Sequence, residues 1–282
     1  MLLLLGAAAV GLVDQRVALI TGGNKGIGKE IARKLISDDF VVLIGCRNTE
    51  LGAAAASELQ CASTRLDLTD LESIASTREY IANEYGRLDM LVNNAAICFN
   101  DPTLYGCVEH HTFEMQADIT MRTNFFGSLA VTREMLPLLR AAPSPRIVNI
   151  ASAAGRLRGS QEKISALTSE TLSVAALEEL MADFVREAQA GTHLDHGWPN
   201  TCYGVSKMGL IALTRVLARD EPSIMVNSVD PGFCATDQNQ NQGYVSAERG
   251  ATTAAMLGAL PDERFLTGMH WFEERKMPWS YQ

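Results

Sequence analysis

Short apolar runs alternate along most of the chain with segments whose apolar residues recur at helical spacing. The unbroken runs, which are typical of strands buried on both faces of a parallel sheet, are residues 17–20, 41–44, 90–92 and 146–150. The segments with helical spacing are residues 27–36, 51–59 and 71–85. Such an alternation of strand and helix predicts an α/β fold, a doubly wound parallel sheet with helices on both faces.

A long insertion interrupts this alternation. Residues 157–199 separate a predicted strand from the next helix, whereas ordinary connections span roughly 2–6 residues. Within the insertion Gly191 is placed to end a helix, and one face of that helix is apolar: Leu177, Leu180, Met181, Phe184 and Ala188. No repeat or low-complexity linker divides the chain, so we predict one domain over residues 15–282, with the helical insertion at about 157–199.

Two further segments fall outside the pattern. Residues 1–14 form an N-terminal extension that is apolar and uncharged as far as Val13. It lacks the basic start of a targeting peptide, and it is too short to span a bilayer. Two interpretations stay open: a targeting peptide, and an added strand or packed extension of the domain. Residues 238–243 are polar and follow a predicted strand. We expect them to form a mobile loop at the edge where open α/β sheets bind ligands.

The charge balance narrows the expected partners. The 282 residues include 24 basic and 33 acidic side chains, a net charge of −9. Nucleic acids and anionic membranes attract basic surfaces, so we expect neither as a partner. Hydrophobic residues make up 47% of the chain and charged residues 20%, which excludes a disordered protein.

The cysteines and histidines indicate neither a disulfide framework nor a metal site. We interpret the cysteines as reduced thiols of a cytoplasmic protein, because none forms a C-x-x-C pair; they are Cys46, Cys61, Cys98, Cys107, Cys202 and Cys234. His193 and His196 lie in the insertion without an evident third ligand, and we interpret both as surface-loop residues.

A glycine-rich segment, TGGNKGIG at residues 21–28, directly follows the first predicted strand and opens a helix. Glycines at such a turn let the backbone approach a pyrophosphate, whose charge the helix N-terminus stabilises. A tight turn without a ligand would use the same residues, but the position after the first strand favours dinucleotide binding. The residues expected to hold the cofactor here are Gly22, Asn24, Lys25, Gly26, Ile27 and Gly28.

The second predicted strand ends in Cys46-Arg47. A domain that binds NAD usually has an acidic residue near this point, which holds the ribose 2′-hydroxyl. Arg47 and Lys25 suit a 2′-phosphate instead, because cationic donors, and the guanidinium fork above all, bind phosphate oxygens. The alternative is that both cations are solvated surface charges. We predict NADP(H) as the cofactor.

A Tyr-x-x-x-Lys pair, Tyr203 and Lys207, falls in a later segment. On a helix these residues share a face, and the cation would favour the phenolate, lowering the pKa of Tyr203 towards a range useful for acid–base catalysis. The spacing also arises by chance on exposed helical faces. Ser152 at a strand end and the glycine-rich segment upstream make a catalytic pair the stronger hypothesis.

Taken in order, these motifs resemble the short-chain dehydrogenase/reductase family over residues 15–272. Within the family the chain is similar to the carbonyl reductase branch, because of the long insertion and of Gly197-Trp198-Pro199 just before the Tyr203 segment. The resemblance implies a Rossmann-type fold with a helical insertion before the catalytic helix. Ala96 departs from the family pattern, which has glycine in the Asn-Asn-Ala-Gly motif.

The resemblance also implies a role for each matching residue. Tyr203 would donate a proton to the carbonyl oxygen, and Lys207 would tune Tyr203 and hold the nicotinamide ribose. Ser152 would hydrogen-bond the substrate oxygen, and Asn124 would position a water in the proton relay. Phe233 would join Ser152 and Tyr203 at the substrate. The other cofactor-binding residues that it implies are Asp67, Leu68, Asn94, Ala95, Pro231, Gly232 and Thr236.

The leading hypothesis is therefore an NADPH-dependent reductase that converts ketones, aldehydes or quinones to alcohols. An alcohol dehydrogenase working oxidatively with the same residues, and a non-catalytic NADP-binding regulator, stay open as alternatives. We also predict a monomer, because the amphipathic helix of the insertion would cover the flank through which family members associate. The competing hypothesis is that this helix forms a new dimer contact.

Overall fold

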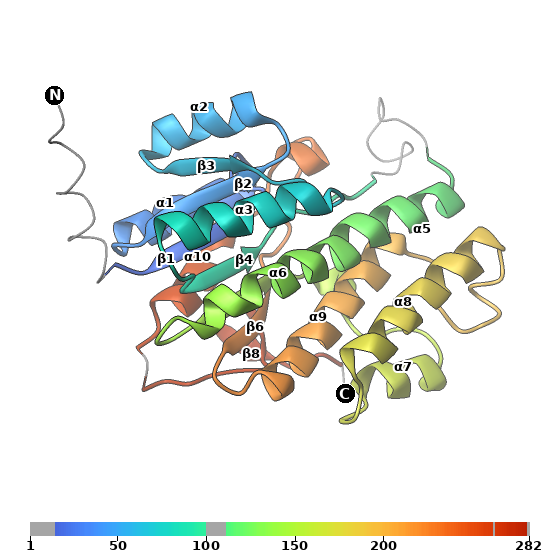
Figure 1. The fold of residues 1–282 in the computed structure, drawn as a ribbon. Coiled ribbons are helices and arrows are strands. Elements are labelled where there is room, and N and C mark those ends of the chain that lie inside the picture. Colours follow the sequence, from blue (N-terminus) through green and yellow to red (C-terminus); the bar gives the residue numbers. More distant parts are fainter. Residues whose placement is uncertain (1–14, 100–110, 262, 281–282) are drawn as a thin grey trace, which may run out of the picture.

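The structure, a computed structural model, describes residues 15–99, 111–261 and 263–280 (Figure 1). Its sheet has eight strands in the order β3-β2-β1-β4-β5-β6-β7-β8. The strands are β1 (Val17–Thr21), β2 (Val41–Cys46), β3 (Ala62–Arg65), β4 (Met90–Asn93), β5 (Arg146–Ile150), β6 (Met225–Asp230), β7 (His270–Phe272) and β8 (Arg275–Met277). Neighbouring strands pair in parallel from β3 to β7, and β8 pairs antiparallel with β7. The predicted doubly wound sheet is confirmed.

Helices cover both faces of this sheet (Figure 1). One layer contains α1 (Gly26–Ser37), α2 (Thr49–Leu59) and α10 (Ala247–Ala259), and the other contains α3 (Leu71–Glu84), α6 (Ser128–Arg140) and α9 (Cys202–Asp220). Successive side chains of a strand point to opposite faces. In β1, Leu19 therefore joins the apolar core under one layer, and Ile20 joins the core under the other. This is why the central strands read as unbroken apolar runs in the sequence.

Local side-chain caps set where several helices begin. The side chain of Asn48 accepts a hydrogen bond from the backbone N–H of Leu51 at the start of α2. Asp70 accepts from the backbone N–H groups of Glu72 and Ser73 at the start of α3. Such caps satisfy donors that have no partner inside the helix, and the boundaries fall within two residues of the predicted ones.

The insertion folds into α7 (Gln161–Thr168) and α8 (Val174–Gln189), and α8 packs against α9 and α5 (Phe113–Met121). The predicted apolar face of α8 is turned inward: Leu177, Met181, Phe184 and Ala188 are buried, and Leu180 packs against the same core. Gly191 follows the helix end with a φ of 72°, a left-handed conformation that glycine adopts without strain. The amphipathic helix is confirmed.

One prediction about a loop was wrong. His193 is not a surface residue: it is 7% exposed, its ring stacks on Phe113 with centroids 4.4 Å apart, and its Nε2 hydrogen-bonds Asn200. The polar segment 238–243 begins inside the short 3-10 helix η3 (Asp237–Asn239), where the side chain of Asn239 is buried, and its mobility stays a prediction. His196 is exposed, as expected.

The N-terminal extension, residues 1–14, and Cys107 lie outside the described residues. Among the helices that the structure does describe, none combines the length and the apolar character needed to cross a membrane.

Candidate active site

A cavity of about 610 Å³ opens at the carboxyl ends of β1 to β6, the edge at which parallel α/β sheets bind ligands. It extends from the glycine-rich segment to the first turn of α9. The structure gathers around it nearly all of the residues that the sequence predicts for the cofactor and substrate: Gly22, Asn24, Lys25, Gly26, Ile27, Gly28, Arg47, Asp67, Leu68, Asn94, Ala95, Ser152, Tyr203, Lys207, Pro231, Gly232, Phe233 and Thr236.

The glycine-rich segment forms a tight turn between β1 and α1. Gly22 has a φ of 65°, and a Cβ atom on Gly28 would lie 2.4 Å from Nδ2 of Asn94. Asn94 holds the turn by donating to the carbonyl oxygens of Thr21 and Gly22 at 2.9 and 3.2 Å. Helix α1 starts without a side-chain cap, unlike α2 and α3, and its first residues line the cavity. Uncapped N–H groups at this place fit a pyrophosphate.

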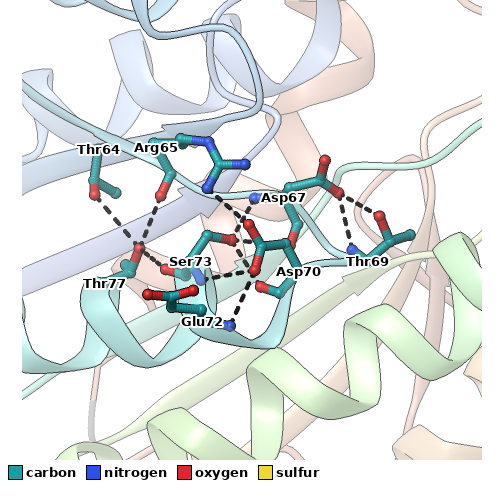
Figure 2. Close-up of polar contacts among 8 residues, drawn as sticks. All are labelled: Thr64, Arg65, Asp67, Thr69, Asp70, Glu72, Ser73 and Thr77. Carbon is teal, nitrogen blue, oxygen red and sulfur yellow. Dashed lines mark hydrogen bonds and ion pairs between the residues drawn. The ribbon is translucent and has the colours of Figure 1, made fainter.

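The turn between β3 and α3 carries Asp67 and is held by its own polar contacts (Figure 2). The carboxylate of Asp67 accepts hydrogen bonds from the backbone N–H and the hydroxyl of Thr69, at 2.9 and 2.8 Å. Oγ of Ser73 accepts from the backbone N–H of Asp67 and contacts the carbonyl oxygens of Asp67 and Asp70. The turn is therefore fixed by the protein alone, before any ligand reaches the cavity.

The end of β2 carries one of the two cations that the sequence predicts for a 2′-phosphate. Cys46 is buried, and its thiol donates to the carbonyl oxygen of Asn48 at 3.2 Å. The side chain of Arg47 is exposed and borders the cavity. Lys25, the second predicted cation, forms an ion pair with Asp237 at 3.1 Å. Both partners of this pair are largely exposed, so solvent screening leaves Lys25 able to turn towards a ligand.

Ser152, Tyr203 and Lys207 meet at the inner end of the cavity. Ser152 follows β5, and its side chain lines the cavity together with that of Tyr203. Lys207 lies one turn further along α9, with its Nζ 5.5 Å from the centre of the Tyr203 ring and 2.7 Å from the carbonyl oxygen of Ile150, to which it donates. Tyr203 and Lys207 therefore lie on the same face of α9, as predicted, and both side chains point into the cavity.

Burial decides the protonation of this pair. It raises the pKa of Tyr203, while hydrogen bonds from Ser152 and Gln238 act in the opposite direction. Burial also lowers the pKa of Lys207 to about 8. Removal from water is the largest cause of both shifts. The lowering of the Tyr203 pKa by Lys207 stays a prediction.

Asn124 lies behind the cavity rather than on its wall. It belongs to a π-helical turn, η1 (Arg122–Gly127), between α5 and α6, and is 1% exposed. Its amide contacts both backbone polar groups of Ile97 and donates to Oγ of Ser206 at 3.1 Å. Ile97 itself lines the cavity, so Asn124 fixes part of the wall of the cavity that contains Tyr203.

Asp230 ends β6 directly before the predicted Pro231 and Gly232, and its carboxylate accepts from the backbone N–H of Gly232 at 3.0 Å; burial raises its pKa. Gln238, from the polar segment expected at this edge, also lines the cavity. Cys98 and Tyr244 line it as well and were missed by sequence reasoning, because no local pattern marks them. Among the described residues, no group of three His, Cys, Asp or Glu side chains is arranged to hold a metal ion.

Comparisons with known proteins agree with this architecture. Residues 16–166 match the family model for short chain dehydrogenases. The chain is 39% identical to carbonyl reductase (NADPH) 1 of Homo sapiens, over 88% of this chain and 92% of that protein, and 38% identical to carbonyl reductase (NADPH) 3 of Mus musculus over the same shares. Salutaridine reductase from Papaver somniferum is similar in structure, with a TM-score of 0.83 and 29% identity over 91% of this chain and 99% of that one.

Menthone neomenthol reductase from Mentha piperita is also similar, with a TM-score of 0.80 and 28% identity over 92% of this chain and 99% of that one. The parallel sheet, the glycine-rich turn and the Tyr203–Lys207 pair therefore occur together in a chain whose relatives share almost its whole length. The chain belongs to the short-chain dehydrogenase family.

Proposed function

We propose that the protein reduces carbonyl compounds, namely ketones, aldehydes or quinones, to alcohols with NADPH. The observation that carries this proposal is the meeting of Ser152, Tyr203 and Lys207 in the cavity that begins at the glycine-rich turn. The relatives named as NADPH carbonyl reductases support the same reaction. NADPH, when bound, supplies the hydride that reduces the carbonyl carbon.

The residues of the chain perform the proton chemistry. Ser152 and Tyr203 hold the substrate oxygen, and Tyr203 transfers its hydroxyl proton to that oxygen as negative charge develops there. Lys207 binds the nicotinamide ribose and stabilises the phenolate that remains. Asn124 keeps the backbone beside this site in place and positions a water of the proton relay. Phe233, 41% exposed at the cavity mouth, offers an apolar surface to the substrate.

The cavity from the glycine-rich turn to Lys207 would hold the cofactor. Gly22, Asn24, Gly26, Ile27 and Gly28, at the start of α1, would hold its pyrophosphate. Arg47 and Lys25 would hold its 2′-phosphate, because the residue that ends β2 is Cys46 and carries no competing negative charge. The remaining contacts come from Asp67, Leu68, Asn94, Ala95, Pro231, Gly232 and Thr236.

The protein acts as a monomer in the cytoplasm. Helix α8 buries its apolar face on α5 and α9, the flank through which family members associate. Its outer face carries ion pairs, Arg186 with Glu179 and Asp183, and Glu178 with Arg133, which suit solvent better than an interface core. The five cysteines in the described part of the chain are free thiols, which suits a reducing compartment.

A screen of NADPH consumption tests the reaction. Quinones, diketones, aldehydes and keto esters are offered to the purified protein, with Tyr203→Phe as the matched variant. We expect turnover with at least one class and its loss in the variant. A protein that binds NADPH but turns over none of the four classes would instead be a binding protein on this fold.

A further inference from the structure

Two segments far apart in the sequence meet at the end of the cavity that the glycine-rich turn forms. The second segment, called here the bridging turn, comprises Thr236 and the 3-10 helix η3 (residues 236–239), and it also lines the cavity. Nζ of Lys25 in the glycine-rich turn lies 3.1 Å from a carboxylate oxygen of Asp237 in the bridging turn. Beside this ion pair, a Cβ atom on Gly26 would lie 3.3 Å from Cγ2 of Thr236. The ion pair therefore links two segments that are in contact at the cavity wall.

The carboxylate of Asp237 projects from a backbone that is held in place. The buried side chain of Asn239 accepts from the backbone N–H of Thr236 at 3.2 Å and donates to the carbonyl oxygen of Cys234 at 2.9 Å. The side chains of Lys25 and Asp237, in contrast, are 63% and 67% exposed. A ligand can therefore draw Lys25 away from Asp237 without moving the bridging turn.

Asp237 and a 2′-phosphate make opposing demands on Lys25. A phosphate monoester carries about two negative charges at neutral pH, and Lys25 and Arg47 are the cations proposed to hold it. The ammonium group of Lys25 is a compact point charge, and in the ion pair the carboxylate of Asp237 already offsets that charge. NADH has a hydroxyl group in place of the phosphate and needs no cation there. The ion pair therefore opposes the binding of NADPH more than that of NADH.

We propose that Asp237 is a specificity-determining residue for the cofactor: its carboxylate competes with the 2′-phosphate of NADPH for Lys25 and so reduces the preference for NADPH over NADH. This rests on the proposed function, in which NADPH is the cofactor. Lys25 exchanges one ion-pair partner for another when NADPH binds, and the pair with Asp237 forms again when NADPH leaves. Because exposed ion pairs contribute little free energy, the competition changes the affinity by about three- to fivefold.

Asp237→Asn tests this competition, because asparagine keeps the shape of the side chain and removes its charge. At low ionic strength the Kd for NADPH should fall by about three- to fivefold, while the Kd for NADH stays unchanged. Adenosine 2′,5′-bisphosphate, which carries the 2′-phosphate without a nicotinamide, should bind more tightly by the same factor. The fluorescence of the bound cofactors and a calorimetric titration of the bisphosphate measure these constants. Unchanged binding of NADH also shows that the variant is folded.

Two further variants separate competition for Lys25 from a general effect of charge. Asp195→Asn removes one negative charge at an exposed position outside the cavity, and it should leave all three constants unchanged. In a Lys25→Gln protein, adding Asp237→Asn should change the Kd for NADPH by less than about twofold, because the cation that both anions need is gone.

Equal affinity for NADPH in the wild type and Asp237→Asn would overturn the proposal, and so would an equal gain for NADPH and NADH. A gain that persists in full in the Lys25→Gln protein would also overturn it, because the carboxylate would then act on the phosphate directly. A wild type that binds NADPH but reduces no carbonyl compound would instead overturn the proposed reaction and leave the role of Asp237 standing.

Discussion

Asn124 binds both polar groups of the Ile97 backbone: its Oδ1 accepts from the N–H at 2.8 Å, and its Nδ2 donates to the carbonyl oxygen at 2.9 Å. This paired contact joins the π-helical turn η1 to the segment that follows β4. Ile97 borders the cavity that Tyr203 also lines, so this contact fixes part of the cavity wall from behind.

Asn124→Ala should weaken both the fold and the reaction. The change leaves the Ile97 backbone without its side-chain partners, and we expect about 2–3 kcal/mol of lost stability in urea unfolding. Turnover should fall as well, because the wall beside Tyr203 is no longer fixed. Asn83→Ala, an exposed position on α3, is the control and should change neither measurement. Full activity in Asn124→Ala would show that the reaction does not need Asn124.

Tyr203→Phe tests the proton donor directly. The phenyl ring preserves the packing but removes the hydroxyl, so carbonyl reduction should fall about 100-fold or more. NADPH binding, measured by the fluorescence of the bound cofactor, should persist. Tyr80→Phe, which changes a tyrosine remote from the cavity on α3, should behave like the wild type. If Tyr203→Phe keeps more than about a tenth of the turnover, another group is the acid.

Arg47→Asp should change the choice of cofactor. We expect the wild type to bind NADPH at least about tenfold more tightly than NADH, or about 1.4 kcal/mol, because the exposed Arg47 borders the cavity where we propose that the 2′-phosphate binds. An aspartate would repel that phosphate and accept from a free 2′-hydroxyl, so the preference should disappear or invert. Titrations with both cofactors measure this. Arg264→Asp makes the same charge change at an exposed position outside the cavity and should leave the preference intact.

His270 should make the fold sensitive to acid. Burial lowers its pKa to about 4 from an ordinary 6.5, with Arg156 acting in the same direction, and its Nδ1 hydrogen-bonds Ser228 at 2.9 Å. Below pH 6.5 the unfolded chain binds a proton that the folded chain does not, so stability falls as the pH decreases from 6.5 towards 4. Between about pH 7 and pH 5 the loss from this residue should be about 2 kcal/mol.

Urea unfolding of wild type and His270→Asn at both pH values isolates this contribution, because the carboxylates are common to the two proteins. The variant should lose less stability on acidification than the wild type. His196→Gln, an exposed histidine, serves as the control and should follow the wild type. Equal losses in the wild type and His270→Asn would show that His270 does not control the acid response.

The mass in solution tests the role assigned to the insertion. Because α8 buries Leu177, Met181, Phe184 and Ala188 within the same chain, light scattering at micromolar concentration should give a mass near 30.6 kDa. A mass near twice 30.6 kDa would refute the monomer.

The sequence by itself determined the alternating strands and helices, the glycine-rich turn and the shared face of Tyr203 and Lys207. These features depend on local periodicity or on a few neighbouring residues, and helix geometry places residues four apart on one side whatever the surroundings. The parallel topology then brings strand ends such as Ser152 and Arg47 to one edge. The roles assigned to these residues stay predictions until the variants are measured.

Only the tertiary structure decided which distant residues meet. His193 looked like a loop residue because the ring that buries it, Phe113, belongs to another helix. Gln238 looked like part of a polar loop, and the fold brings it to the cavity that Tyr203 also lines. The protonation of Tyr203 depends on how far the surrounding chain excludes water, and no sequence spacing encodes that quantity. The local spacing of apolar and turn residues determines the helices and strands. Burial and contacts between residues far apart in the sequence arise only when those helices and strands pack together.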